Sequence, residues 1–133
     1  MNYYDTLIEV ADDCPATEAR VPQARGGIKT KAVVEYELLA KRPYTYTQED
    51  IAFHVYAIVH DIPKANWPTE RKRLLSAGHP HLRVSALAKR YGWGIHNNAE
   101  GKVALIAVES PEYKRLLNNP RTSKIKAFRS SRA

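Results

Sequence analysis

The sequence has a single cysteine, Cys14, among its 133 residues, so no disulfide can form within the chain. One free thiol is typical of a reducing compartment, and we expect a cytoplasmic protein. Nowhere do about 18 apolar residues follow one another. Residues 1–10 contain neither a basic segment nor a long apolar run. The sequence therefore predicts neither a membrane span nor an export signal.

Fingerprints of catalysis and nucleotide binding are also missing. The chain contains no Gly-x-Ser-x-Gly elbow, no Walker A loop and no Gly-x-Gly-x-x-Gly turn. Cys14 follows Asp12 and Asp13, and acidic neighbours disfavour the thiolate that a nucleophile needs. His79 and His81 are only two ligands, which are too few for a metal site. We expect no metal and no cofactor, and the sequence favours a non-catalytic protein.

The formal net charge of +7 is unevenly distributed along the chain. Beyond residue 113 there is no acid, and seven cations are present: Lys114, Arg115, Arg121, Lys124, Lys126, Arg129 and Arg132. The other 14 cations balance the 14 acids, so the rest of the chain is neutral. We expect one folded domain over residues 1–120. Residues 121–133 are predicted to be a basic, disordered tail, because they have little apolar surface to bury.

Periodicity and capping signals predict an α+β fold. Thr47 and Asp50 have capping-box spacing before an apolar helical stripe. Residues 97–101 have the composition of a hairpin turn, and the apolar strand that follows is expected to be central. The predicted strands are 6–10, 81–85, 93–96 and 102–109, and the predicted helices are 30–41, 48–60, 67–77, 86–91 and 111–117. Residues 30–41 also alternate as a strand would. We expect a small mixed or antiparallel sheet with helices packed on one face.

The most distinctive stretch of the sequence places cations and aromatic residues around two glycines. In the strand predicted there, Trp93 points to one side and His96 to the other. If Arg83 and Ser85 lie on a neighbouring strand and face His96, the three side chains could hold a carboxylate or a phosphate. A structural alternative pairs Arg83 with Glu109 and lets His96 cap the turn. The candidate binding residues are Arg83, Ser85, Lys89, Arg90, Trp93 and His96.

Nucleic-acid binding is the alternative hypothesis. Two helices, a basic third helix and a hairpin follow one another in the order of a winged helix-turn-helix. The third helix of such a domain enters the major groove, yet a neutral body argues against a basic binding face. The residues that would contact nucleic acid are Arg71, Lys72, Arg73, Arg121, Lys124, Lys126, Arg129 and Arg132.

Several segments together resemble a family of small bacterial proteins defined only as a domain of unknown function. They are Ile8-Glu-Val-Ala-x-Asp-Cys-Pro15, Tyr36-Glu-Leu-Leu39, Pro43-Tyr-x-Tyr-Thr-x-Glu-Asp50, Leu82-Arg-x-Ser85 and Lys89-Arg-Tyr-Gly-Trp-Gly-Ile-His96. The resemblance spans residues 6–117, and the last segment is its most specific part. The chain departs from the family at His81, where a Cys is common, and at Leu74 and Leu75, where aromatic residues are common. The resemblance implies a bacterial origin and assigns no activity.

These patterns favour one function over two others. We expect a non-catalytic binding module for a small anionic molecule or a protein partner, acting through the sheet face around Arg83 and His96. Nucleic-acid binding is the first alternative. A small enzyme that uses His96 and Arg83 is the second.

Overall fold

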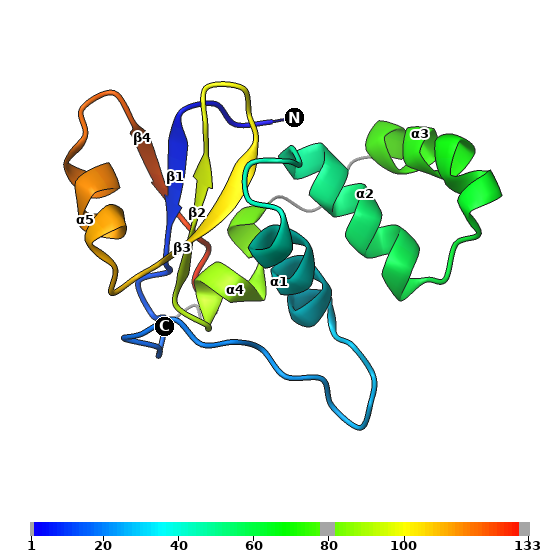
Figure 1. The fold of residues 1–133 in the computed structure, drawn as a ribbon, viewed down its shortest axis with the longest axis horizontal. Coiled ribbons are helices and arrows are strands. Elements are labelled where there is room, and N and C mark those ends of the chain that lie inside the picture. The colour runs from blue at the N-terminus through cyan, green and yellow to red at the C-terminus, as the bar shows by residue number, and fades with distance from the viewer. Residues whose placement is uncertain (1, 78–81, 131–133) are drawn as a thin grey trace.

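The structure, a computed structural model, describes residues 2–77 and 82–130. In these residues the chain forms four strands, five α-helices and two 3-10 helices (Figure 1). The strands are β1 (Thr6–Glu9), β2 (Trp93–Asn97), β3 (Val103–Ala107) and β4 (Ser123–Lys126). The helices are α1 (Lys31–Lys41), α2 (Gln48–Val59), η1 (Lys64–Asn66), α3 (Trp67–Ala77), η2 (Leu82–Val84), α4 (Ala86–Lys89) and α5 (Pro111–Asn118). The predicted α+β class is confirmed.

The strands form one mixed sheet in the order β3-β2-β1-β4. β2 is antiparallel to both β1 and β3, whereas β4 is parallel to β1. The β2–β3 turn includes Gly101, whose φ of 79° lies in the left-handed region that favours glycine. The prediction that the last apolar strand is central is wrong, because β3 lies at the edge. The Tyr44 N–H donates to the Val103 carbonyl at 2.9 Å and covers part of that edge.

Helices cover both faces of the sheet, rather than the one face expected from the sequence (Figure 1). On one face, Tyr113 and Leu116 of α5 pack against Leu7 of β1 and Ile106 of β3. On the other face, α1, α2 and α4 enclose a larger core that contains Ile8. Successive residues of a strand point to opposite faces, so Leu7 and Ile8 enter different cores. β3 is apolar on both sides for this reason, although it is not central.

The prediction of a disordered tail does not hold for residues 123–126, which form β4. This strand pairs with β1 from Ser123, opposite Thr6, to Lys126, opposite Glu9. Ala127 is buried directly after it. The backbone of β1 supplies a row of donors and acceptors, and pairing with it orders a segment that has few apolar side chains of its own. Residues 131–133 of the predicted tail lie outside the described residues.

Side-chain caps mark the predicted helix starts. Thr30 caps α1, which is therefore a helix and not the alternative strand. Thr47 and Asp50 form a complete capping box at the start of α2. Ser110 caps α5 by accepting the Tyr113 N–H at 3.2 Å. The capping box of α2 is a local contact, and that is why the spacing of Thr47 and Asp50 predicts it.

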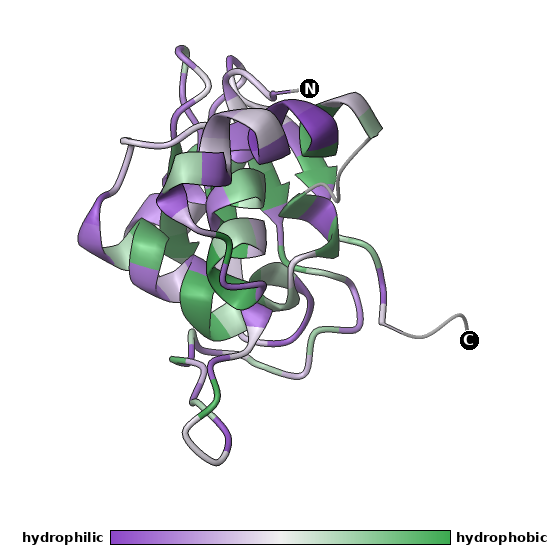
Figure 2. Cartoon of the chain, turned by 90° about the vertical axis from the view of Figure 1, so that its right-hand side faces the viewer, coloured by the Kyte–Doolittle hydropathy of each residue, from purple (hydrophilic) through white to green (hydrophobic). Residues whose placement is uncertain are grey.

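α3 lies beside α2, away from the sheet (Figure 1). The Trp67 ring of α3 lies 5.3 Å from the Phe53 ring of α2, measured between centroids. None of the residues of α3 is buried. Figure 2 looks at the molecule from this side and shows hydrophilic and hydrophobic residues alternating along the helices. α3 thus extends the helical layer outward instead of sealing the space between α1 and α2.

Candidate functional site

The prediction of a strand at residues 81–85 is wrong. Leu82–Val84 form η2, and residue 81 lies outside the described residues. The Leu82 N–H donates to Oε1 of the buried Gln48 at 2.8 Å, so α2 binds the start of this segment. Ser85 then caps α4 by accepting the Leu87 N–H at 3.2 Å. Neither η2 nor Ser85 pairs with β2.

The structure does not bring Arg83, Ser85 and His96 together. The Arg83 Nε donates to the Lys126 carbonyl at 2.8 Å, and its guanidinium lies 4.3 Å from the centroid of the Phe128 ring. Ser85 faces α1, where its hydroxyl donates a hydrogen bond to Glu35. His96 lies on the opposite face of the sheet, on the side covered by α5. The anion site expected from these three side chains is therefore not formed.

His96 has other partners on its own face. Its Nδ1 lies 2.9 Å from the hydroxyl of Tyr44. Burial lowers the pKa of His96, and the negative charges of Glu112 and Asp5 act in the opposite direction. Tyr44 has a φ of 55°, an uncommon conformation for a residue with a side chain. The pair consists of a half-buried imidazole and a tyrosine that covers the edge of the sheet.

The other predicted binding residues lie around the end of α4 and the start of β2. Trp93 donates from Nε1 to the Arg20 carbonyl at 2.8 Å, and its ring lies 5.6 Å from that of Tyr36. This contact attaches the long connection before α1 to the sheet. Lys89 is partly buried in the last turn of α4, and the Arg90 that follows is exposed.

Several cations proposed to contact nucleic acid have acidic partners. Arg71 binds Asp50 at 2.8 Å, and Arg73 binds Glu70 at 2.6 Å. Lys126 of β4 pairs with an aspartate near the end of β1. These pairs reduce the positive charge that α3 and β4 offer to a polyanion. Among the remaining predicted contacts, Lys72, Arg121 and Arg129 are exposed, Lys124 is partly buried, and Arg132 lies outside the described residues.

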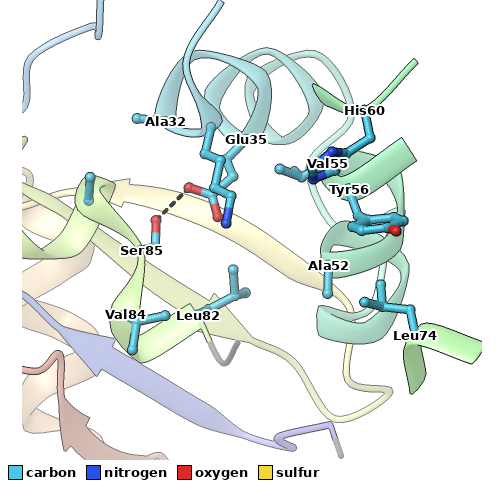
Figure 3. A pocket seen from close by; sticks show the side chains of 12 residues that line it. Ala32, Glu35, Ala52, Val55, Tyr56, His60, Leu74, Leu82, Val84 and Ser85 are labelled. Carbon is cyan, nitrogen blue, oxygen red and sulfur yellow. Dashed lines mark hydrogen bonds between the residues drawn. The ribbon is translucent and has the colours of Figure 1, made fainter. Parts of the chain in front are cut away.

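A cavity of about 300 Å³ lies on the helical side of the molecule, between α1, α2, α3 and the η2–α4 segment (Figure 3). Its walls are mainly apolar and include Ala52, Val55 and Tyr56 of α2, Leu74 of α3, and Leu82 and Val84 of η2. An engineered apolar cavity of about 150 Å³ is enough to bind benzene. The space is therefore large enough for a small organic molecule.

Glu35 of α1 is the acid that faces this cavity (Figure 3). Its Oε1 accepts a hydrogen bond from the Ser85 hydroxyl at 2.8 Å. Burial raises the pKa of Glu35 to about 7, and the Ser85 hydrogen bond and the charge of Lys31 offset this only in part. Near neutral pH the carboxyl group is therefore divided between its ionised and protonated forms. An acid with this property in a cavity is a candidate for ligand binding.

Sequence patterns gave Glu35 no role, although one signal for it was present. Glu35 follows Ala32 by three residues and precedes Leu39 by four, and both of these are buried. The acid thus belongs to the inward stripe of its helix. Its partner Ser85 is 50 residues away, so no local pattern could reveal the pair. Ser85 itself was predicted as a binding residue, but with different neighbours.

Groups of metal-ligating side chains and membrane-spanning helices were both sought in the part of the chain that the structure describes. There, no three His, Cys, Asp or Glu side chains are grouped so that they could hold a metal ion. His79 and His81 lie outside the described residues. No helix among residues 2–77 and 82–130 combines the length and the apolar content needed to cross a bilayer.

The chain belongs to a family of unknown function, DUF6157, whose model matches residues 1–133. No curated protein and no solved structure matches the chain. Membership confirms the resemblance to a domain of unknown function and assigns no activity. The chemistry of the cavity is therefore the basis for a functional proposal.

Proposed function

We propose that this DUF6157 protein binds a small, mainly apolar molecule in the cavity between α1, α2, α3 and η2. The observation that carries the proposal is the cavity of about 300 Å³, whose mainly apolar walls include a hydrogen-bonded polar pair, Glu35 and Ser85. Small-molecule sites combine apolar walls with a few converging polar groups in the same way. The volume suits a ligand with on the order of ten non-hydrogen atoms.

The proposal keeps the binding module expected from the sequence but changes its anchor. Arg83, the expected anion-binding group, is engaged by the Lys126 carbonyl and the Phe128 ring. The polar anchor of the cavity is instead an acid, Glu35. An acid recognises donors and cations, so a simple anion is not the favoured ligand.

We also propose that the protein acts in the cytoplasm of a bacterium. Cys14 is a free cysteine, which fits a reducing compartment. The bacterial origin rests on the family resemblance of the sequence. Fractionation of the source cells, with detection of the native protein, tests this proposal. Recovery outside the cytoplasm would contradict it.

The binding proposal is tested with 2-phenylethanol, a neutral probe with an aromatic body and one hydroxyl group. Titration into the ¹⁵N-labelled protein should shift the amide signals of Ala52, Val55 and Leu82, which line the cavity. Ala52→Phe should weaken binding at least roughly tenfold, because the larger side chain occupies the space. Ala40→Phe adds the same bulk at an exposed position of α1 and should leave binding unchanged.

Two results would contradict the binding proposal. In one, folded Ala52→Phe binds the probe as tightly as the original protein. In the other, the probe shifts only signals distant from the cavity. The amide spectrum of each variant shows whether it is folded, so a loss of structure is not mistaken for a loss of binding.

A further inference from the structure

We infer that the cavity selects a ligand that carries a protonated amine on an apolar body, with the ammonium group bound by Glu35. This inference rests on the proposed function and specifies the chemical class of its ligand. It depends on the unused hydrogen-bonding capacity of Glu35, on the charge balance around it and on the cavity wall opposite it.

The hydrogen bonds of Glu35 leave most of its capacity unused. The Ser85 Oγ accepts the Leu87 N–H at 3.2 Å and directs its own proton to Glu35 Oε1 at 2.8 Å. Ser85 is therefore committed as a donor and cannot give the same proton to a ligand. An ionised carboxylate has about four acceptor sites. Among the described residues, Ser85 is the only group that donates a hydrogen bond to this carboxyl.

The charge of Glu35 is also uncompensated by a direct ion pair. Lys31 lines the same cavity from the exposed start of α1, but no described cation forms a salt bridge with Glu35. A carboxylate away from water is stabilised by a close cation that also donates hydrogen bonds. A ligand ammonium supplies both. A ligand carboxylate would meet like charge at Glu35, and the basic groups among the described residues that line the cavity, Lys31 and His60, are both exposed.

The wall across the cavity from Glu35 suits the rest of such a ligand (Figure 3). Ala52 and Val55 of α2 and Leu82 of η2 offer apolar contacts. The Tyr56 ring lies on the same wall, and aromatic faces attract cations as well as apolar groups. The amine therefore has a carboxyl group to bind, and its hydrocarbon body has a surface to cover.

Three probes with the same phenylethyl body test the inference: 2-phenylethylamine, 2-phenylethanol and 3-phenylpropionate. Their dissociation constants are measured by NMR titration at pH 8, where Glu35 is mostly ionised and the amine is still protonated. The amine should bind at least roughly tenfold more tightly than the alcohol, because its ammonium group adds the attraction of opposite charges to the hydrogen bond that either probe donates to the carboxylate. The carboxylate should bind most weakly.

Glu35→Gln should remove the preference for the amine and leave the affinity for the alcohol within about twofold, because apolar contacts dominate binding of the alcohol. Glu37→Gln is the matched control. It removes the same charge from the same helix, but the Glu37 side chain is 42% exposed and pairs with Lys29. This control should keep the full preference for the amine.

The possible outcomes separate the two proposals. If the alcohol binds in the cavity and the amine binds no more tightly, the amine inference fails and the proposed function stands. If 3-phenylpropionate binds most tightly, a basic group of the cavity, Lys31 or His60, is the anchor and the inference is overturned. If none of the three probes shifts signals from the cavity, both the inference and the proposed function fail.

Discussion

The two faces of the sheet are covered in different ways. On one face, Tyr113 of α5 lies so close to Gly94 that a Cβ atom at Gly94 would be 2.5 Å from the Tyr113 ring. On the other face, α1, α2 and α4 bury a larger core, but short side chains such as Ala32 and Ala52 line the space beyond it. On the first face, a large side chain packs directly on a glycine and leaves no room for a further atom there. Several helices with small side chains, and an outlying α3, leave a cavity.

The largest expected effect comes from removing the strand that both faces share. Deleting residues 121–133 should lower the free energy of unfolding by about 3 kcal/mol or more, because β1 becomes an edge and Leu7 and Ile8 lose cover on opposite faces. Urea unfolding measures the effect. Deleting only 129–133 leaves β4 in place and should cost less than about 1 kcal/mol. Equal stability of both truncated chains would show that β4 contributes nothing to either face.

The second prediction adds atoms to each face in turn. Gly94→Ala should destabilise the protein by about 3 kcal/mol, because the new methyl group overlaps the Tyr113 ring and neither can move freely. Ala52→Leu adds a larger group on the side of the cavity and should change stability by less than about 1 kcal/mol. Chemical denaturation of both variants measures the contrast. Similar costs for the two would mean that the faces are packed alike.

The third prediction uses pH to probe the acid in the cavity. The pKa of Glu35 is about 7 in the folded protein against 4.5 for an ordinary glutamate, so the folded state binds the proton more tightly. Its contribution to stability is therefore greatest at low pH and is lost as the pH rises from about 4.5 through 7. Glu35→Gln should stabilise the protein by about 2 kcal/mol at pH 8 and by much less at pH 5. The value at pH 8 is smaller than the full pKa difference implies, because some water still reaches the carboxylate.

Urea unfolding of the Glu35→Gln variant at both pH values provides this measurement. Glu37→Gln serves as the control, because its exposed side chain should give a difference that hardly depends on pH. A stability difference for Glu35→Gln that is constant from pH 5 to pH 8 would contradict the raised pKa.

The smallest expected effect concerns His96, which lies on the sheet face covered by α5. Arg83→Ala should leave the NMR titration of His96 unchanged within about 0.2 pH units, because Arg83 contacts Lys126 and Phe128 on another side of the molecule. Tyr44→Ala should raise the pKa of His96 toward its usual 6.5, because the imidazole becomes more exposed. A change in the pKa of His96 in the Arg83→Ala variant would contradict the separation of these two residues.

The sequence by itself determined the features that depend on neighbouring residues. Thr47 predicts a helix start because a cap is a bond to a backbone group two or three residues ahead. The turn at 97–101 follows from the same kind of local chemistry, with Gly101 in the left-handed region. The class of the fold follows from these elements, since their order and period are set along the chain.

Only the tertiary structure decided the features that join distant segments. η2 replaces the predicted strand because Gln48, 34 residues earlier, binds the Leu82 N–H. β4 is ordered because it pairs with the edge of β1 that β2 leaves open, and β1 lies near the other end of the chain. Glu35 becomes an acid with a raised pKa because packing against α2 and η2 removes water from it. Such contacts leave no local pattern, because each partner satisfies its own helix or strand and their meeting depends on the packing of the whole chain.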